Sequence, residues 1–209
     1  MSSANSVLVT GGAGFIGSHT VDLLIERGYR VRILDCLERP THLTGKPEHL
    51  NRDAEFIRGD IRNLDDLSRA LIGMDSVLHL AATGGFTPDI AKYFDTNSIG
   101  TANLLELIQQ QNFHVRRIVV ASSVGIYGEG QYSCAACGPR EGAPRSLEQL
   151  KAGDWEMKCP DCEKTMSHLP TRESKTPSPE KAYSISKFDE ERLVLGFGRD
   201  FGIETCALR

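Results

Sequence analysis

A glycine-rich turn near the amino terminus is the feature that most constrains the fold of this chain. Residues 6–10 are an apolar run typical of a strand, and residues 15–27 carry apolar side chains at helical spacing. A turn of this kind lets the backbone approach the pyrophosphate of a dinucleotide at a helix N-terminus. Taken alone the pattern is weak, because such a turn can also serve only the packing of helix on strand. Its glycines fit two spacings, Gly12, Gly14 and Gly17 or Gly11, Gly14 and Gly17.

Strand and helix patterns alternate along the rest of the chain. Further strands are predicted at residues 30–34, 55–57, 76–80, 115–121 and 203–208, and helices at 64–72, 94–111 and 182–199. Near-continuous apolar strands separated by helices indicate a parallel sheet that is buried on both faces and wound with right-handed crossovers. The sequence therefore predicts one α/β domain over residues 1–209, with a doubly wound sheet of the Rossmann type.

Asp35 follows the second predicted strand, eighteen residues after Gly17. A carboxylate at this place can accept hydrogen bonds from the adenosine ribose hydroxyls and repels a 2′-phosphate. Asp35 therefore favours NAD over NADP. The alternative is a solvated loop acid with no ligand.

Tyr183 and Lys187 lie four residues apart, and hence on one face of a predicted helix. The ammonium, together with the positive nicotinamide ring of NAD, should lower the pKa of the Tyr183 phenol toward the range of a general base. Ser122 and Ser123 end a strand at the carboxyl edge of the sheet, where open α/β folds bind ligands. Ser123 is the candidate for substrate contact and Ser122 a structural or cofactor-side serine, unless both only end the strand.

Residues 128–179 break the alternating pattern and are too long for an ordinary loop. The predicted insert, residues 129–176, holds two Cys-x-x-Cys pairs at a spacing close to that of four-thiolate zinc ribbons. Four thiolates leave no open position on the metal, so zinc would be structural and would order the loop. The alternatives are two disulfides or free thiols. The four predicted ligands are Cys134, Cys137, Cys159 and Cys162.

Smaller details of the cysteine pattern also carry expectations. Gly138 after the first pair suits a tight knuckle turn, whereas Glu163 occupies the matching place after the second. Cys36 and Cys206 have no partner at ligand spacing and are expected to be buried thiols.

The composition indicates a globular protein with a small soluble ligand. The net charge of −4 comes from acids and bases mixed along the chain, so no basic stripe points to nucleic acid or to a membrane surface. No apolar stretch reaches the roughly 18 residues of a membrane helix. The polar amino terminus does not resemble a signal peptide, and we expect a cytoplasmic protein.

Five segments in this order resemble the extended short-chain dehydrogenase/reductases of the NAD-dependent epimerase/dehydratase group. They are TGGAGFIGSH, LHLAA, Asn97 with the GTxNLLE segment at residues 100–106, ASSVGIYGEG and YSISK, and the resemblance covers essentially the whole chain. It implies a catalytic set of Ser123, Tyr183 and Lys187. It also implies that Asp60 and Ile61 flank the adenine. The full set of implied NAD contacts is Gly11, Gly14, Phe15, Ile16, Gly17, Asp35, Asp60, Ile61, Leu80, Ala81, Ala82, Asn97, Ser122, Tyr183 and Lys187.

The resemblance also narrows the reaction. Related 4,6-dehydratases carry an acid pair directly after the catalytic hydroxyl residue, where this chain has Val124 and Gly125, so epimerisation without elimination fits better. The cysteine insert, with the phrase at residues 150–156, resembles bacterial dTDP-L-rhamnose 4-epimerases. This likeness implies transient oxidation of a nucleotide sugar to a 4-keto intermediate, followed by hydride return.

Family members continue after the last strand into a substrate domain, so the resemblance implies that this chain, which stops at Arg209, is the cofactor half. It also implies a homodimer formed through helices that correspond to residues 94–111 and 182–199. Two alternatives remain open. One is another nucleotide-sugar oxidoreductase or decarboxylase of the same superfamily, and the other is a catalytically silent NAD-binding module.

Overall fold

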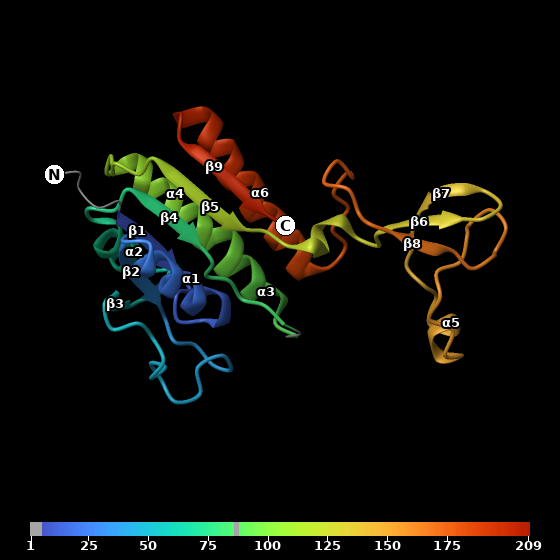
Figure 1. Cartoon of the computed structure of the whole chain (residues 1–209), viewed down its shortest axis with the longest axis horizontal. Helices are drawn as coiled ribbons and strands as arrows, with labels where there is room; N and C mark the ends of the chain where they lie inside the picture. Colours follow the sequence, from blue (N-terminus) through green and yellow to red (C-terminus); the bar gives the residue numbers. More distant parts are fainter. Residues whose placement is uncertain (1–5, 86–87) are drawn as a thin grey trace. The chain divides into compact units, whose positions relative to one another are not determined.

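A six-stranded parallel sheet organises the larger part of the chain in the computed structural model, which describes residues 6–85 and 88–209. Its strand order is β3-β2-β1-β4-β5-β9, and every neighbouring pair is parallel (Figure 1). This order and the alternating helices confirm the predicted Rossmann-type sheet. The strands are β1 (Ser6–Thr10), β2 (Arg30–Asp35), β3 (Glu55–Arg58), β4 (Ser76–His79), β5 (Arg117–Ala121) and β9 (Glu204–Leu208).

Both faces of the sheet are covered, because alternate side chains of each strand point to opposite sides. Val9 of β1 packs in the cluster that includes Val21 of α1 (Phe15–Glu26). Leu8 packs in the other cluster, which the remaining long helices complete with Leu67, Leu104 and Val194. These helices are α2 (Leu64–Leu71), α4 (Gly100–Gln110) and α6 (Ala182–Phe201).

The helix predicted at residues 94–111 begins earlier than expected and is irregular. Helix α3 (Ile90–Tyr93) starts after Asp89, whose side chain accepts a hydrogen bond from the Lys92 backbone N–H. A π-helical segment, η1 (Phe94–Ile99), then leads into α4. The capping acid explains the earlier start, and a π-helical turn is a deviation that occurs often at functional sites.

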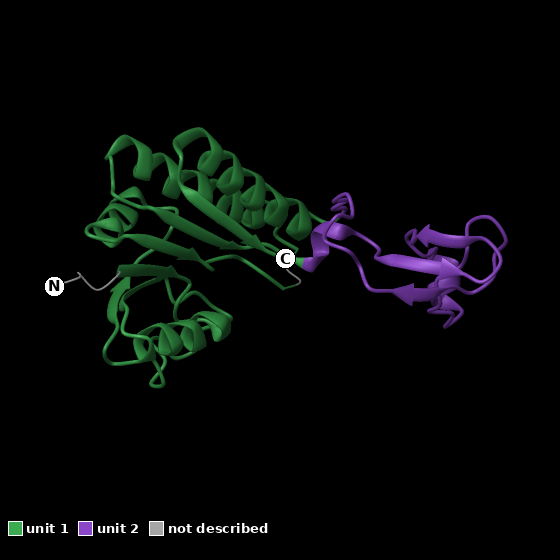
Figure 2. Cartoon of the chain, turned by 45° about the horizontal axis from the view of Figure 1, so that its top comes forward, with its two compact units in different colours: residues 1–123, 181–209 green, residues 124–180 purple. Residues whose placement is uncertain are grey.

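Residues 124–180 form a second compact unit (unit 2), distinct from unit 1, which is made by residues 1–123 and 181–209 (Figure 2). The predicted insert lies within unit 2. Its three-stranded antiparallel sheet has the order β7-β6-β8, and strands this short carry no readable period. The elements are η2 (Val124–Tyr127), β6 (Gln131–Cys134), β7 (Gly138–Glu141), α5 (Leu147–Lys151) and β8 (Ser167–Leu169).

None of the helices in the part of the chain that the structure describes is both long and apolar enough to cross a bilayer.

Candidate cofactor, catalytic and metal sites

The glycine turn packs against itself so closely that side chains are excluded. A Cβ on Gly17 would lie 2.2 Å from the Gly11 carbonyl oxygen, and a Cβ on Gly11 would lie 2.7 Å from Cα of Ala81. Gly11 also has a φ of +68°, which favours glycine. Helix α1 begins at this turn, and Gly14 at its N-cap makes no side-chain cap, which leaves first-turn N–H groups for an anion.

Asp35 ties the end of β2 to this turn. Its Oδ2 accepts a 3.0 Å hydrogen bond from the Ala13 N–H, and its Oδ1 accepts a 2.8 Å hydrogen bond from the Leu37 N–H. His42 Nε2 lies 3.6 Å from the same Oδ1. Because Asp35 is only 8% exposed, the alternative of a solvated loop acid is wrong.

A pocket lies at the carboxyl edge of β1, β2 and β4 and brings together about half of the expected contact residues. Of those residues it is lined by Gly11, Gly14, Asp35, Asp60, Ile61, Leu80, Ala81 and Ala82. Phe15, Ile16, Gly17, Asn97, Ser122, Tyr183 and Lys187 do not line it. Phe15 and Ile16 are instead exposed, by 81% and 65%, at the start of α1.

Basic side chains of the pocket were not identified from the sequence. Arg62 Nη2 lies 2.6 Å from Asp60 Oδ2, and Arg62 Nη1 lies 3.1 Å from Asp95 Oδ2. The hydrogen bonds from Arg62 hold the pKa of the Asp60 carboxyl below its usual value. Lys92 and His42 also line the pocket, but an isolated basic residue carries no recognisable sequence pattern.

Asn97 is fully buried and fixes the loop that follows β4. Its Oδ1 accepts a 2.7 Å hydrogen bond from the Thr83 N–H, and its Nδ2 donates to the Thr83 carbonyl oxygen and to Ser186 Oγ. The side chain therefore joins η1, α6 and the loop that continues into the pocket.

Tyr183 lies in the first turn of α6 and interacts with Ser123 at the end of β5. Its ring packs edge-on against Tyr93, with ring centroids 5.9 Å apart. Burial raises the pKa of the Tyr183 phenol, and the hydrogen bond from Ser123 offsets only part of that rise. The expectation that Lys187 lowers this pKa is wrong for the chain as it stands.

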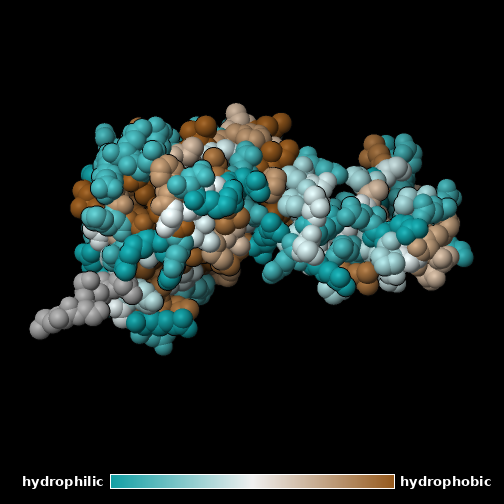
Figure 3. All heavy atoms as spheres, turned by 90° about the horizontal axis from the view of Figure 1, so that it is seen from above, coloured by the Kyte–Doolittle hydropathy of each residue, from teal (hydrophilic) through white to brown (hydrophobic). Residues whose placement is uncertain are grey.

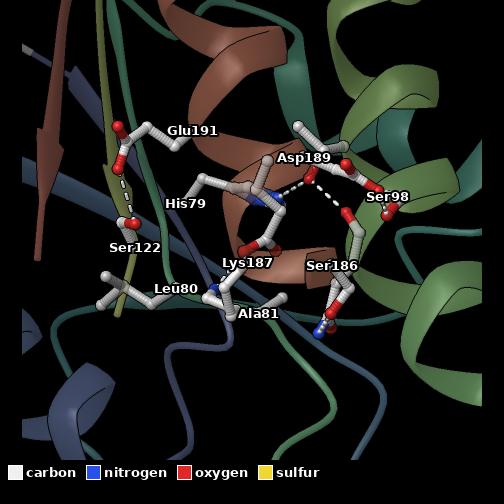
Figure 4. Close-up of polar contacts among 12 residues, drawn as sticks. His79, Leu80, Ala81, Ser98, Ser122, Ser186, Lys187, Asp189 and Glu191 are labelled. Carbon is white, nitrogen blue, oxygen red and sulfur yellow. Dashed lines mark hydrogen bonds and ion pairs between the residues drawn. The ribbon is translucent and has the colours of Figure 1, made fainter. Parts of the chain in front are cut away.

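Lys187 does not lower the Tyr183 pKa because its ammonium forms an ion pair with Glu190, one helical turn further along α6. Both residues are buried, and the run of acids in this part of the helix did not reveal the pair in the sequence. Close by, His79 is held between the hydroxyls of Thr10 and Thr101, at 2.7 and 2.9 Å from its two ring nitrogens. Figure 4 shows His79 and Lys187 between the sheet and α6.

Ser122 faces α6. Its hydroxyl donates to Glu191 (Figure 4), and the guanidinium of Arg209 pairs with the same carboxylate. The structure thus places the two neighbouring serines in different contacts, Ser123 with Tyr183 and Ser122 with Glu191.

The four cysteines of the insert lie together in unit 2. Their sulfur atoms are all within 4.8 Å of one another, and all are free thiols, so the disulfide alternative does not hold. Backbone N–H groups of Ala136 and Cys137 point at Cys134 Sγ and hold its pKa below the usual value. The two knuckles match, because Gly138 and Glu163 both have positive φ, +77° and +58°.

The remaining cysteines differ from expectation in part. Cys36 is half-buried, whereas Cys206 is exposed, so the prediction of a buried thiol is wrong there. Cys206 lies on β9, which is paired on one side by β5, and the alternating side chains of β9 leave it at the surface.

Comparison with known proteins identifies the family. The sequence model of the NAD dependent epimerase/dehydratase family matches residues 7–146. A putative UDP-glucose 4-epimerase of Methanocaldococcus jannaschii is 33% identical over 208 residues, which are 97% of this chain and 54% of that protein. A dTDP-L-rhamnose 4-epimerase of Burkholderia thailandensis is 29% identical over 195 residues, which are 90% of this chain and 52% of that protein.

Solved structures agree. A UDP-glucuronic acid 4-epimerase from Bacillus cereus in complex with NAD superposes with a TM-score of 0.70 at 30% identity, over 98% of this chain and 56% of the other. The chain thus spans about half the length of relatives such as these. With the sheet order, the glycine turn and the family match in agreement, the chain belongs to the NAD-dependent epimerase/dehydratase family.

Proposed function

We propose that this chain is the cofactor-binding part of an NAD-dependent nucleotide-sugar 4-epimerase, with dTDP-L-rhamnose or a related dTDP-6-deoxyhexose as substrate. The observation that carries the proposal is the contact of Tyr183 with Ser123 at the carboxyl edge of β5, on the same edge of the sheet as the glycine turn. The dTDP-L-rhamnose 4-epimerase of Burkholderia thailandensis is among the relatives that align with most of this chain, and it motivates the choice of sugar.

The residues present fit NAD. The turn at Gly11 and Gly17 has no room for a Cβ, so a flat ligand can approach its backbone, and the buried Asp35 carboxylate at the end of β2 favours ribose hydroxyls over a phosphate. Phe15 and Ile16 would cover the cofactor beside the helix N-terminus, while Asn97 would act by holding the Thr83 loop. When bound, NAD supplies the acceptor and later the donor of a hydride.

The chain's own residues would handle the proton. Tyr183 would take the proton of the sugar C4 hydroxyl and return it after the keto sugar has turned over, and Ser123 would hydrogen-bond the same oxygen. Because burial keeps the Tyr183 pKa raised, a positive charge brought by the cofactor is needed to favour the phenolate. Lys187 lies on the same helix face, four residues further along α6. Val124 and Gly125 hold no acid, so water elimination has no proton donor there.

The cysteine cluster fits a structural zinc ion. Tetrahedral Zn–S bonds of about 2.3 Å place sulfur atoms roughly 3.8 Å apart. The four sulfur atoms lie within 4.8 Å of one another, so shifts of about an ångström or less would complete the shell. The apolar cluster around the cysteines buries Cys134, Met157, Cys159 and Met166, and so small a core needs a bound metal to hold the segment in order. We expect one zinc per chain by metal analysis of purified protein, and loss of that zinc in Cys159→Ser.

A homodimer is also proposed. Unit 1 exposes apolar side chains (Figure 3), among them Ile99 of η1 and Leu193 and Phe201 of α6. These lie on the two helical regions expected to form the dimer. The cytoplasmic location expected from the sequence stays a prediction.

Two measurements test the function. Titration calorimetry with NAD⁺ should show one site on the 209-residue chain. Anaerobic incubation with dTDP-L-rhamnose and NAD⁺ should invert C4 of the sugar, read by proton NMR, without net NADH absorbance. The same assay is run on this chain joined to the carboxyl-terminal half of the Burkholderia relative. Turnover by the joined protein alone would assign this chain to the cofactor half, and inactivity of both would overturn the rhamnose proposal.

Matched variants separate catalysis from folding. Tyr183→Phe should abolish inversion and leave NAD⁺ affinity within about threefold, because the phenol oxygen carries the proton while the ring packing remains. Tyr29→Phe is the control, since Tyr29 precedes β2 at the opposite edge of the sheet. Net NADH production in place of inversion would favour a dehydrogenase of the same superfamily.

A further inference from the structure

Three side chains on α6 form one stripe that starts at the site. Tyr183, Lys187 and Glu190 occupy positions i, i+4 and i+7, which lie on a single helix face. The proposed catalytic site uses Tyr183 and Lys187. It gives no role to the third side chain of the stripe, the buried and titratable Glu190.

Glu190 is deeply buried and depends on Lys187. The residue is 0% exposed, and among the described residues neither of its carboxylate oxygens accepts a well-formed hydrogen bond. Its contact with a positive charge is the ion pair with the Lys187 ammonium, which is itself 2% exposed. A buried carboxylate without hydrogen bonds is tolerated only when a neighbouring charge or a proton neutralises it.

Few other charged groups near Glu190 could replace Lys187 as its counter-charge. On α6 the neighbouring Asp189 is itself an acid and offers no positive charge: its carboxylate accepts a hydrogen bond from Ser98 of η1, and its negative charge raises the Glu190 pKa. From β4, His79 is neutral, because burial and then the Lys187 charge lower its pKa to about 3. The charged groups on the other packed elements have partners elsewhere: Arg117 of β5 with Glu204 of β9, Asp95 of η1 with Arg62, and Lys92 of α3 with Glu38. Tyr93 of α3 packs on Tyr183, and Glu191 pairs with Arg209.

We propose that Glu190 is a positioning residue for the reaction, which anchors the Lys187 ammonium and, by binding or releasing a proton, sets how much of its positive charge acts on Tyr183. This inference rests on the proposed function for its consequence in catalysis, but the charge coupling itself is a property of the folded chain.

The electrostatics give the direction of the effect. An ionised Glu190 cancels much of the Lys187 charge and adds a negative charge two helical turns from Tyr183, which raises the pKa of the phenol. A protonated Glu190 leaves the ammonium uncompensated and so favours the phenolate. Burial raises the pKa of Glu190 to about 7, so this exchange falls in the neutral range.

The experiment reads the two titrations directly. Tyrosine labelled with ¹³C at Cζ, with Tyr183 assigned by its absence in Tyr183→Phe, reports the phenol, and glutamate labelled at Cδ reports the carboxyl. We expect one glutamate signal to titrate near pH 7 in the unaltered chain, and the Tyr183 signal to show a small step at the same pH. In Glu190→Gln that glutamate signal should be absent, and the midpoint of the Tyr183 phenol should fall by roughly one pH unit.

The matched control is Asp189→Asn, which removes the adjacent carboxylate that does not contact Lys187, and it should leave the Tyr183 midpoint unchanged. An unchanged midpoint in Glu190→Gln, or equal shifts in both variants, would overturn the proposal. If Glu190→Gln does not fold, the absence of the step in the unaltered chain would equally overturn it. In an active, extended protein Glu190→Gln should also remove a limb near pH 7 from the profile of kcat. If the step at Tyr183 is present in the unaltered chain and lost in Glu190→Gln, but the extended protein does not invert C4, the epimerase proposal is wrong and the charge coupling still holds.

Discussion

The Ser122 hydroxyl donates a 2.7 Å hydrogen bond to Oε2 of Glu191, whose side chain is 2% exposed. Arg209 completes the contact, with Nη2 2.6 Å from Oε1 of the same carboxylate. One buried carboxylate therefore joins the end of β5, the middle of α6 and the residue that follows β9. The same elements carry Ser123 and Tyr183, so this contact fixes the frame in which those two residues meet.

Removing the Glu191 carboxylate should destabilise unit 1. Glu191→Ala leaves a guanidinium that is only partly exposed and a hydroxyl without their acceptor, and we expect a loss of about 2–3 kcal/mol. Burial alone would raise the Glu191 pKa, but Arg209 and Ser122 hold it below the usual value. The stabilisation is therefore present above about pH 4.5 and is lost as the pH falls further.

Urea unfolding followed by circular dichroism at neutral pH and again below about pH 4.5 measures this effect. Ser122→Ala removes a single hydrogen bond and should cost about 1 kcal/mol. A Glu191→Ala variant as stable as the unaltered chain at neutral pH would contradict the structural role of the contact.

Two helical glycines should respond to alanine in opposite directions. Gly17→Ala would place a Cβ 2.2 Å from a backbone oxygen, so we expect a loss of at least about 2 kcal/mol and a tenfold or greater loss of NAD⁺ affinity. Gly196→Ala, inside α6, meets Arg199 Nη2 at an ordinary 3.7 Å and should gain about 0.5–1 kcal/mol from helix propensity. Thermal unfolding and titration calorimetry measure both variants, and a stable, NAD-binding Gly17→Ala would refute the tight turn.

The pH dependence of stability should show two opposing groups. The His79 pKa falls from 6.5 to about 3 on folding because of burial, so its contribution is present above pH 6.5 and is lost as the pH falls. The Glu190 pKa rises from 4.5 to about 7, so its contribution is present below pH 4.5 and is lost as the pH rises. Between pH 4.5 and 6.5 the two slopes, each about 1.4 kcal/mol per pH unit, cancel.

Replacing either His79 or Glu190 should therefore reveal how the free energy of unfolding depends on pH through the other residue. We expect His79→Asn to lose stability as the pH rises from 4.5 to 6.5, and Glu190→Gln to gain stability over the same range. Urea unfolding at several pH values gives the slopes. Parallel curves for the unaltered chain and both variants would show that these two side chains do not titrate as their burial implies.

The sequence predicted the sheet well because its strands are apolar on both faces, as parallel strands must be. Its turn chemistry also placed the glycines and Asp35 correctly at one edge. The start of α3 was missed because Asp89 caps a helix of only 4 residues, which is too short for a period to be visible. The strands of unit 2 were missed because they are short and Cys134 is the one side chain that β6, β7 and β8 bury, so no alternating apolar set marks them.

For the candidate site, motif spacing selected Tyr183 and Lys187, but it did not indicate the carboxylate of Glu190 that pairs with Lys187. Glu190 is the second of three consecutive acids, Asp189, Glu190 and Glu191. The sequence alone does not tell which of these acids are buried and which are solvated. Rotation about the helix axis decides this: Asp189 reaches Ser98, Glu190 reaches Lys187 and Glu191 reaches Ser122 and Arg209. The sequence predicted the wrong direction for the shift of the Tyr183 pKa because it revealed neither the burial of the phenol nor the nearby Glu190 carboxylate, which both raise this pKa.

The two cysteine knuckles make a final matched pair. Glu163 adopts φ +58°, a left-handed conformation that strains a side chain with a Cβ, whereas Gly138 adopts φ +77° with open space around its Cα. Glu163→Gly should therefore stabilise the knuckle by about 1 kcal/mol and slow zinc loss to a chelator by roughly fivefold, while Gly138→Ala should do the reverse. Colorimetric zinc release under excess chelator measures both rates. Equal release rates in the two knuckle variants would mean that the turns do not limit metal retention.

Cys159→Ser should release zinc at once and leave residues 124–180 open to protease, with the melting of unit 1 little changed, since the two units have separate cores.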